Sequence, residues 1–119
     1  MNGKIYDSEL KILDVLWQNG ATTARDIAAR LQEDVGWRKT TTYTVIRKCL
    51  EKGIVAKEEP DFLCRPLVTR EQVQQMETAD LLDKLYDGAP DRLIASLLDS
   101  QKLSPEQISR LKRLVAELE

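Results

Sequence analysis

The hydrophobic pattern of this chain changes period at Gly53. Stretches before that glycine carry apolar residues at helical spacing, whereas the runs that follow it are short and β-compatible. Ile54–Glu58 and Phe62–Val68 read as two strands, and Glu59-Pro60-Asp61 between them is a turn signal. Three helices followed by a hairpin is the order of a winged helix-turn-helix unit. The fold expected is therefore mainly α, with a small β-hairpin wing.

The ends of the three helices can be predicted from capping residues. Asp7 or Ser8 caps the first helix, which ends at Asn19-Gly20. Thr23 and Asp26 resemble a capping box, so the second helix starts there and runs to about Gln32. The third spans about Arg38–Lys52. The expected buried stripes are Leu10, Leu13, Leu16 and Trp17; then Ala24, Ile27, Ala28 and Leu31; then Ile46, Cys49 and Leu50 with Thr42 or Val45. Pro66 predicts that the returning strand lies at a sheet edge or has a break there.

The third helix has an unusual charge balance. Six residues from Arg38 to Lys57 are cationic and only Glu51 is acidic, although the whole chain has 18 basic and 20 acidic side chains and a net charge of −2. Clustered Lys and Arg favour a phosphate backbone, and Thr and Tyr hydroxyls bond phosphates or base edges. Lys57 and Arg65 in the wing are placed to reach phosphates beside the helix. The alternative is an ordinary solvated helix face.

The last third of the chain is helical and acidic. A helix is expected from the capping pair Thr69 and Gln72 to about Tyr86, and it is broken by Asp87-Gly88-Ala89-Pro90. A shorter helix follows, and the last helix begins at Ser104, which Gln107 helps to cap. Three short amphipathic helices are too little sequence to bury all their apolar residues, so a partner copy is expected, with packing onto the first domain as the alternative. The predicted dimerisation residues are Val73, Met76, Leu82, Leu85, Leu93, Leu97, Ile108, Leu111, Val115 and Leu118. The expected domains are 1–69, which binds DNA, and 70–119, which dimerises.

Several classes of function are disfavoured. The chain has no histidine, no glycine-rich phosphate loop and no nucleophile beside a plausible base, which argues against an enzyme and predicts no cofactor. Cys49 and Cys64 make neither a disulfide framework nor a zinc pattern, so no metal is expected. Cys49 is expected to be buried, and Cys64 either packed or exposed. With no secretory leader and no apolar run long enough for a membrane span, we expect a soluble cytoplasmic protein.

The order of short motifs is similar to that of a known family, the penicillinase, methicillin-resistance and copper-transport repressors (BlaI/MecI/CopY). The motifs are Ser8-Glu9-Leu10 with Val15-Leu16-Trp17, Trp37 four residues before Thr41, Thr44, the helix end Lys52-Gly53, Pro66-Leu67-Val68, and Lys102-Leu103-Ser104-Pro105-Glu106. Together they span almost the whole chain.

This resemblance implies a homodimeric winged-helix repressor with its third helix in the major groove of a pseudo-palindromic operator. The DNA-facing positions that it implies are Arg38, Lys39, Thr40, Thr41, Tyr43, Thr44, Arg47 and Lys48. Tyr43 stands where the family often has a lysine, and it could instead be a packed core side chain.

Three departures from the family leave the signal open. Ser96-Leu97 stands where antibiotic-responsive members have the Asn-Phe bond that is cut. No cysteine follows Cys64, whereas copper-responsive members bind metal through cysteines near their C-terminus. Phe62 is the only aromatic residue of the wing, where the family usually has several. A sensor, ligand or protease is therefore unidentified. The alternatives kept are a winged-helix module that binds proteins and a regulator that responds through its thiols.

Overall fold

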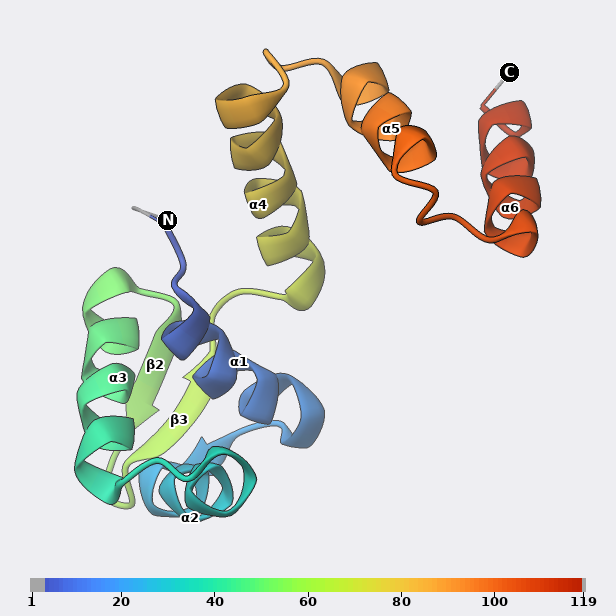
Figure 1. Ribbon diagram of the computed structural model, residues 1–119. Coiled ribbons are helices and arrows are strands. Elements are labelled where there is room, and N and C mark those ends of the chain that lie inside the picture. Colours follow the sequence, from blue (N-terminus) through green and yellow to red (C-terminus); the bar gives the residue numbers. More distant parts are fainter. Residues whose placement is uncertain (1–3, 119) are drawn as a thin grey trace. The chain divides into compact units, whose positions relative to one another are not determined.

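The computed structural model describes residues 4 to 118, which form two compact units. The first unit extends to Gln75 and the second begins at Met76. Along the chain the elements are α1 (Asp7–Asn19), β1 (Thr22–Thr23), α2 (Ala24–Val35), α3 (Lys39–Lys52), β2 (Val55–Glu58), β3 (Leu63–Pro66), α4 (Arg70–Leu85), α5 (Pro90–Asp99) and α6 (Pro105–Ala116) (Figure 1). Helices and a small antiparallel sheet in this order confirm the predicted fold class.

Most of the predicted helix ends are correct. Thr23 accepts a hydrogen bond from the backbone N–H of Asp26, and Gly53 ends α3 with a φ of 75°. The prediction for α1 was wrong: its N-cap is Tyr6, and neither Asp7 nor Ser8 caps it. The carboxylate of Glu9 accepts the N–H of Tyr6 at 2.8 Å, so an acid in the first turn satisfies this backbone donor instead. Helix α2 also runs three residues beyond Gln32.

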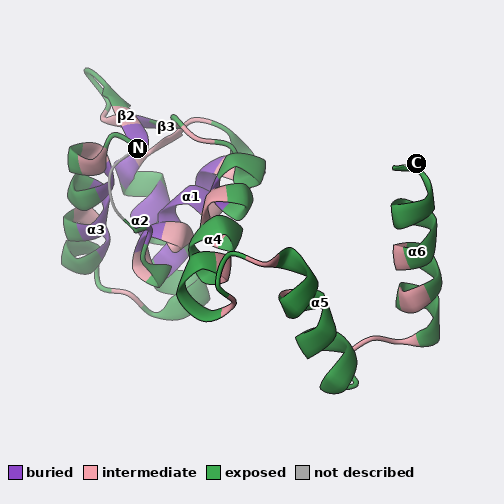
Figure 2. Ribbon diagram, turned by 90° about the horizontal axis from the view of Figure 1, so that it is seen from above, coloured by how far each residue is buried: buried purple, intermediate pink, exposed green. Residues whose placement is uncertain are grey.

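The core of the first unit lies between the helices and the sheet. Figure 2 shows buried residues on the inward faces of α1, α2 and α3 and on the strands. The large side chains with almost no exposed surface are Ile12, Leu13, Leu16, Ile27, Ile46 and Ile54. Burying six such side chains stabilises the unit by roughly 1.5–3 kcal/mol each before entropy is counted. Thr42 and Val45 are both buried on α3, while Leu50 is half-buried.

The sheet has the order β1-β3-β2. β2 and β3 form the predicted hairpin, in which Glu58 faces Leu63 and Val55 faces Pro66. The sequence did not predict β1, a two-residue strand that pairs with the other side of β3 through Thr22 and Thr23. β3 is therefore the central strand at Leu63 and Cys64, whereas Pro66 pairs with β2 alone. Of the two expectations for Pro66, the break in the strand is the one observed. Pro66 is the last residue of β3, so the ladder ends where proline has no N–H to donate.

The second unit consists of the end of α4 together with α5 and α6. Thr69 and Gln72 cap α4, and Ser104 and Gln107 cap α6, each pair through two reciprocal hydrogen bonds as predicted. No residue of α5 or α6 that the structure describes is buried (Figure 2). No helix within residues 4–118 is long and apolar enough to cross a membrane.

Candidate nucleic-acid interface

Helix α3 has one buried face and one polar face. Thr42, Val45, Ile46 and Cys49 are buried against the rest of the first unit. Apart from Glu51, the exposed side chains at the N-cap and along α3 are hydroxyls and cations: Arg38, Lys39, Thr40, Thr41, Thr44, Arg47 and Lys48. Seven of the eight residues predicted to face DNA on this helix are thus exposed to solvent. The eighth, Tyr43, is half-buried, which is intermediate between the two predictions made for it.

The cations of this surface are not neutralised by the protein. Within residues 4–118, none of Arg38, Lys39, Arg47 and Lys48 forms an ion pair. The first turn of α3 contains no acid, and its N-cap, Arg38, makes no side-chain capping bond. Free backbone N–H groups at a helix N-terminus favour anions, and here two cations stand beside them. The surface therefore combines charge and backbone donors suited to phosphate.

The hydroxyl of Thr44 is held in a fixed orientation. It donates a hydrogen bond to the carbonyl of Thr40, one turn earlier, at 2.9 Å. Because a hydroxyl has two further lone pairs, Thr44 can still accept a bond from a ligand. Since Thr44 is exposed, such an acceptor would suit a donor on a base edge.

The two cations predicted to contact DNA from the wing, unlike those of α3, form ion pairs. Lys57 pairs with Glu59 at 3.1 Å, and Arg65 pairs with Glu58 across the hairpin. Both side chains are about half exposed, at 41% and 51%. Contact with phosphate would have to compete with these carboxylates, so the wing offers less free positive charge than α3.

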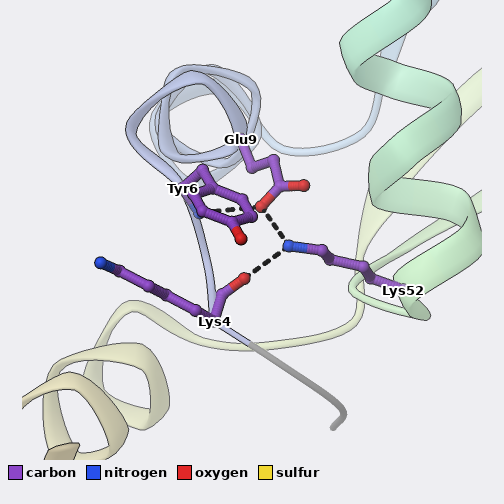
Figure 3. A network of polar contacts seen from close by, with 4 residues as sticks. All are labelled: Lys4, Tyr6, Glu9 and Lys52. Carbon is purple, nitrogen blue, oxygen red and sulfur yellow. Dashed lines mark hydrogen bonds and ion pairs between the residues drawn. The ribbon is translucent and has the colours of Figure 1, made fainter.

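The position of α3 is fixed by a polar network that the sequence analysis missed (Figure 3). The Glu9 side chain is only 1% exposed, and its Oε1 accepts hydrogen bonds from Lys52 Nζ at 2.7 Å and from the N–H of Tyr6 at 2.8 Å. Lys52 also donates to the carbonyl of Lys4, and its ammonium lies 4.4 Å from the centroid of the Tyr6 ring. The network ties the start of α1 to the end of α3.

A second contact that was missed joins α3 to the wing. The rings of Tyr43 and Phe62 have their centroids 5.9 Å apart and meet nearly perpendicularly, at 81°. The only sequence signal was that Phe62 is the sole aromatic residue in the wing. Nothing in the local pattern indicates its partner.

The two thiols are buried. Burial raises the pKa of Cys49 from 9.0 to about 12, with the Glu9 charge adding to the effect, and burial raises the pKa of Cys64 to about 11. Both sulfurs are therefore neutral near pH 7, which disfavours a thiol switch. In the part of the chain that the structure describes, no group of three or more His, Cys, Asp or Glu side chains could hold a metal ion.

The residues predicted for dimerisation separate into two sets. Val73 is buried within the first unit. The other nine lie at or beyond Met76, and four of them are well exposed: Leu85 (65%), Leu97 (38%), Val115 (56%) and Leu118 (85%). In the second unit a groove of about 360 Å³ is lined by Ile94, Leu98, Ile108, Leu111, Lys112 and Val115. Five of these six lining residues are apolar.

Comparison with models of protein families shows which family this chain belongs to. The family model of the penicillinase repressors matches residues 5–117 of this chain. The chain belongs to the penicillinase repressor family. The resemblance inferred from the sequence is thereby confirmed, and the family is one of DNA-binding transcriptional repressors, not of enzymes.

Individual relatives are similar over nearly their whole length. The chain is 22% identical to the penicillinase repressor of Bacillus licheniformis over 116 residues, which is 96% of this chain and 91% of that relative. It is 21% identical to the methicillin resistance regulatory protein MecI of Staphylococcus aureus strain N315, over 97% of this chain and 98% of that relative.

Solved structures resemble the fold of part of the chain. The DNA-binding domain of the repressor BlaI is 20% identical, with a TM-score of 0.53 over 60% of this chain and 93% of that one. The B. licheniformis BlaI monomer in complex with the blaP half-operator is 22% identical, with a TM-score of 0.51 over 59% of this chain and 88% of that one. The resemblance supports the winged-helix fold.

Proposed function

We propose that this penicillinase repressor family member binds a pseudo-palindromic operator as a homodimer and represses transcription there. Helix α3 is the recognition helix and enters the major groove, while the β2–β3 wing lies along the sugar-phosphate backbone. Such a repressor works in the cytoplasm, where the operator is. The family relationship and the solved BlaI half-operator complex support this proposal.

One observation carries the DNA-binding part of the proposal. The exposed face of α3 presents Arg38, Lys39, Arg47 and Lys48 without an ion pair inside the described chain, together with three threonine hydroxyls. A solvated helix face usually mixes charges of both signs, whereas this one has Glu51 as its only acid. Unpaired cations gain from the release of counterions held by DNA, and hydroxyls can read base edges.

The apolar surface of the second unit supports the homodimer. Leu98, Leu114 and Val115 are between 49% and 56% exposed on helices that bury no residue. A contiguous apolar groove on a single chain is expected to be covered by a partner. A two-fold dimer carries two recognition helices, so it requires an inverted repeat in the DNA.

The test is a gel-shift titration with DNA from upstream of the gene that encodes this chain, against a scrambled duplex of equal length. Arg47→Ala should lower operator affinity at least about tenfold, and it should reduce the slope of log K against log salt by about 0.9 for each lost phosphate contact, or about 2 per dimer. Lys84→Ala removes an exposed cation from the second unit and serves as the control. If both variants bind like the wild type, α3 is not the recognition helix.

The dimer is tested separately by analytical ultracentrifugation. Leu98→Asp places a charge in the apolar groove and should give a monomer that binds operator far more weakly, because each monomer retains only one α3. Arg110→Asp changes an exposed residue of α6 that does not line the groove, and should stay dimeric. A wild-type monomer at micromolar concentration would refute the proposed assembly.

The alternative is a module that binds another protein through the second unit, whose exposed apolar residues favour an interaction surface of some kind. Specific operator binding that weakens steeply with salt separates the two, because a protein-binding module has no reason to show it. Neither the repressor proposal nor this alternative identifies the inducing signal, whether it is a ligand, a sensor or a protease.

A further inference from the structure

Four side chains join α3 to the wing in a row. Lys39 Nζ lies 5.8 Å from the centroid of the Tyr43 ring, the Tyr43 ring meets the Phe62 ring edge to face, and Lys57 Nζ lies 4.1 Å from the Phe62 centroid. Edge-to-face rings and a cation over a ring face are both favourable geometries. We name Lys39, Tyr43, Phe62 and Lys57 the aromatic bridge. It connects two predicted DNA contacts of the helix with one of the wing.

The backbone of Phe62 is held firmly. Its φ of 52° lies in the left-handed region, which costs an aromatic residue energy and persists only where the surroundings impose it. The Phe62 carbonyl accepts the N–H of Ala24 at 2.9 Å, at the start of α2. The next residue, Leu63, pairs with Thr23 of β1 on one side and with Glu58 of β2 on the other. The ring of Phe62 therefore projects from a point fixed by three elements.

Tyr43, in contrast, lies on helix α3 between buried Thr42 and exposed Thr44. It lies one turn after Lys39 and one turn before Arg47, and it is half-buried. The side chain of a helical tyrosine chooses between two χ1 rotamers, neither of which the helix itself imposes. The contact with Phe62 is what favours one of them. The wing thus sets the direction of a side chain on the DNA-facing helix.

We propose that Phe62 is a positioning residue for operator recognition. It holds Tyr43, and through it Lys39, in one arrangement before DNA arrives, so that less side-chain freedom is lost when a particular base sequence is met. Nonspecific binding relies on phosphate charge, which does not require a fixed tyrosine. Phe62 therefore raises the ratio of operator to random-DNA affinity without contacting DNA. This inference rests on the proposed function.

The experiment measures the ratio of operator affinity to random-DNA affinity for the whole 119-residue chain. Phe62→Leu keeps apolar bulk but removes the ring, and it should lower the ratio about tenfold per dimer, because two ring contacts are lost. Phe62→Tyr keeps the ring and should retain the ratio. Leu67→Ala, an exposed apolar residue just after β3, is the control. The salt dependence of random-DNA binding should be unchanged in all three, since no phosphate contact is removed.

A double-mutant cycle distinguishes positioning from a general loss of structure. In a Tyr43→Ala background, Phe62→Leu should change the ratio less than twofold, because there is no tyrosine left to position. An equal loss in both backgrounds, or a wild-type ratio in Phe62→Leu, overturns the proposal while the repressor function stands. A wild-type protein that does not prefer the operator overturns the proposed function and this inference together.

Discussion

The ion pair between Glu9 and Lys52 offers the sharpest test of how α3 is held. Lys52→Ala removes one of the two donors to Glu9 Oε1 and takes the counter-ion from a carboxylate whose side chain is only 1% exposed in the native protein. Breaking a buried pair from one side costs about 3–5 kcal/mol, and since Lys52 itself is 22% exposed we expect about 3 kcal/mol. That is a large part of the roughly 5–15 kcal/mol by which a domain is stable.

The assay is urea unfolding followed by tryptophan fluorescence. Trp17 and Trp37 are the two tryptophans of the chain, and both lie in the first unit, so their signal reports on that unit. Lys57→Ala is the matched control, because its partner Glu59 is 65% exposed and an exposed pair contributes at most about 1 kcal/mol. Its contact with the Phe62 ring adds about 0.5–1 kcal/mol, so the total stays below the loss expected for Lys52→Ala. The double variant Glu9→Gln/Lys52→Met should recover most of the loss, because no buried charge remains. If Lys52→Ala costs no more than Lys57→Ala, the network does not hold α3 in place.

Two further predictions concern buried groups of the first unit. Thr42 has no exposed surface, and its hydroxyl has no hydrogen-bond partner among residues 4–118. Thr42→Val should therefore stabilise the unit by about 1 kcal/mol in the same urea assay, and a loss of stability would show that the hydroxyl is satisfied. Because burial raises the pKa values of Cys49 and Cys64 above 9.0, to about 12 and about 11, the folded state binds more protons than the unfolded state in alkali. The free energy of unfolding should therefore fall as pH rises through 9 to 12, and it should fall less in Cys49→Ala/Cys64→Ala; equal slopes for the two proteins would contradict the burial of the thiols.

The features that sequence predicts well here are those encoded within a few residues. The reciprocal bonds of Thr69 with Gln72, the stop at Gly53 and the buried stripe of α2 each depend on neighbours in the chain. Helix order and the hairpin followed from these local signals together. The DNA-facing role of the α3 residues remains a prediction, although their exposure agrees with it.

The features that sequence did not predict depend on partners far along the chain. Glu9 looked like an ordinary residue of a first helical turn, and its burial is compensated by Lys52, 43 residues away. Tyr43 on α3 and Phe62 in the wing come from different elements, so no local pattern pairs their rings. β1 has just two residues, too few to show a period. Pro66 ends β3, which is one of the two outcomes expected of that proline, but the pairing of Leu63 and Cys64 with β1 was not predicted.

The central position of β3 has a consequence for protein engineering. Each residue from Leu63 to Pro66 is in register with β2, and the first two also pair with Thr22 and Thr23. A wing transplanted from another repressor would therefore have to match two partners at once, so a one-residue difference in strand length would turn the side chains of β3 to the opposite face. The turn from Glu59 to Asp61 pairs with neither strand, so its length and composition can be varied without changing the register of β3.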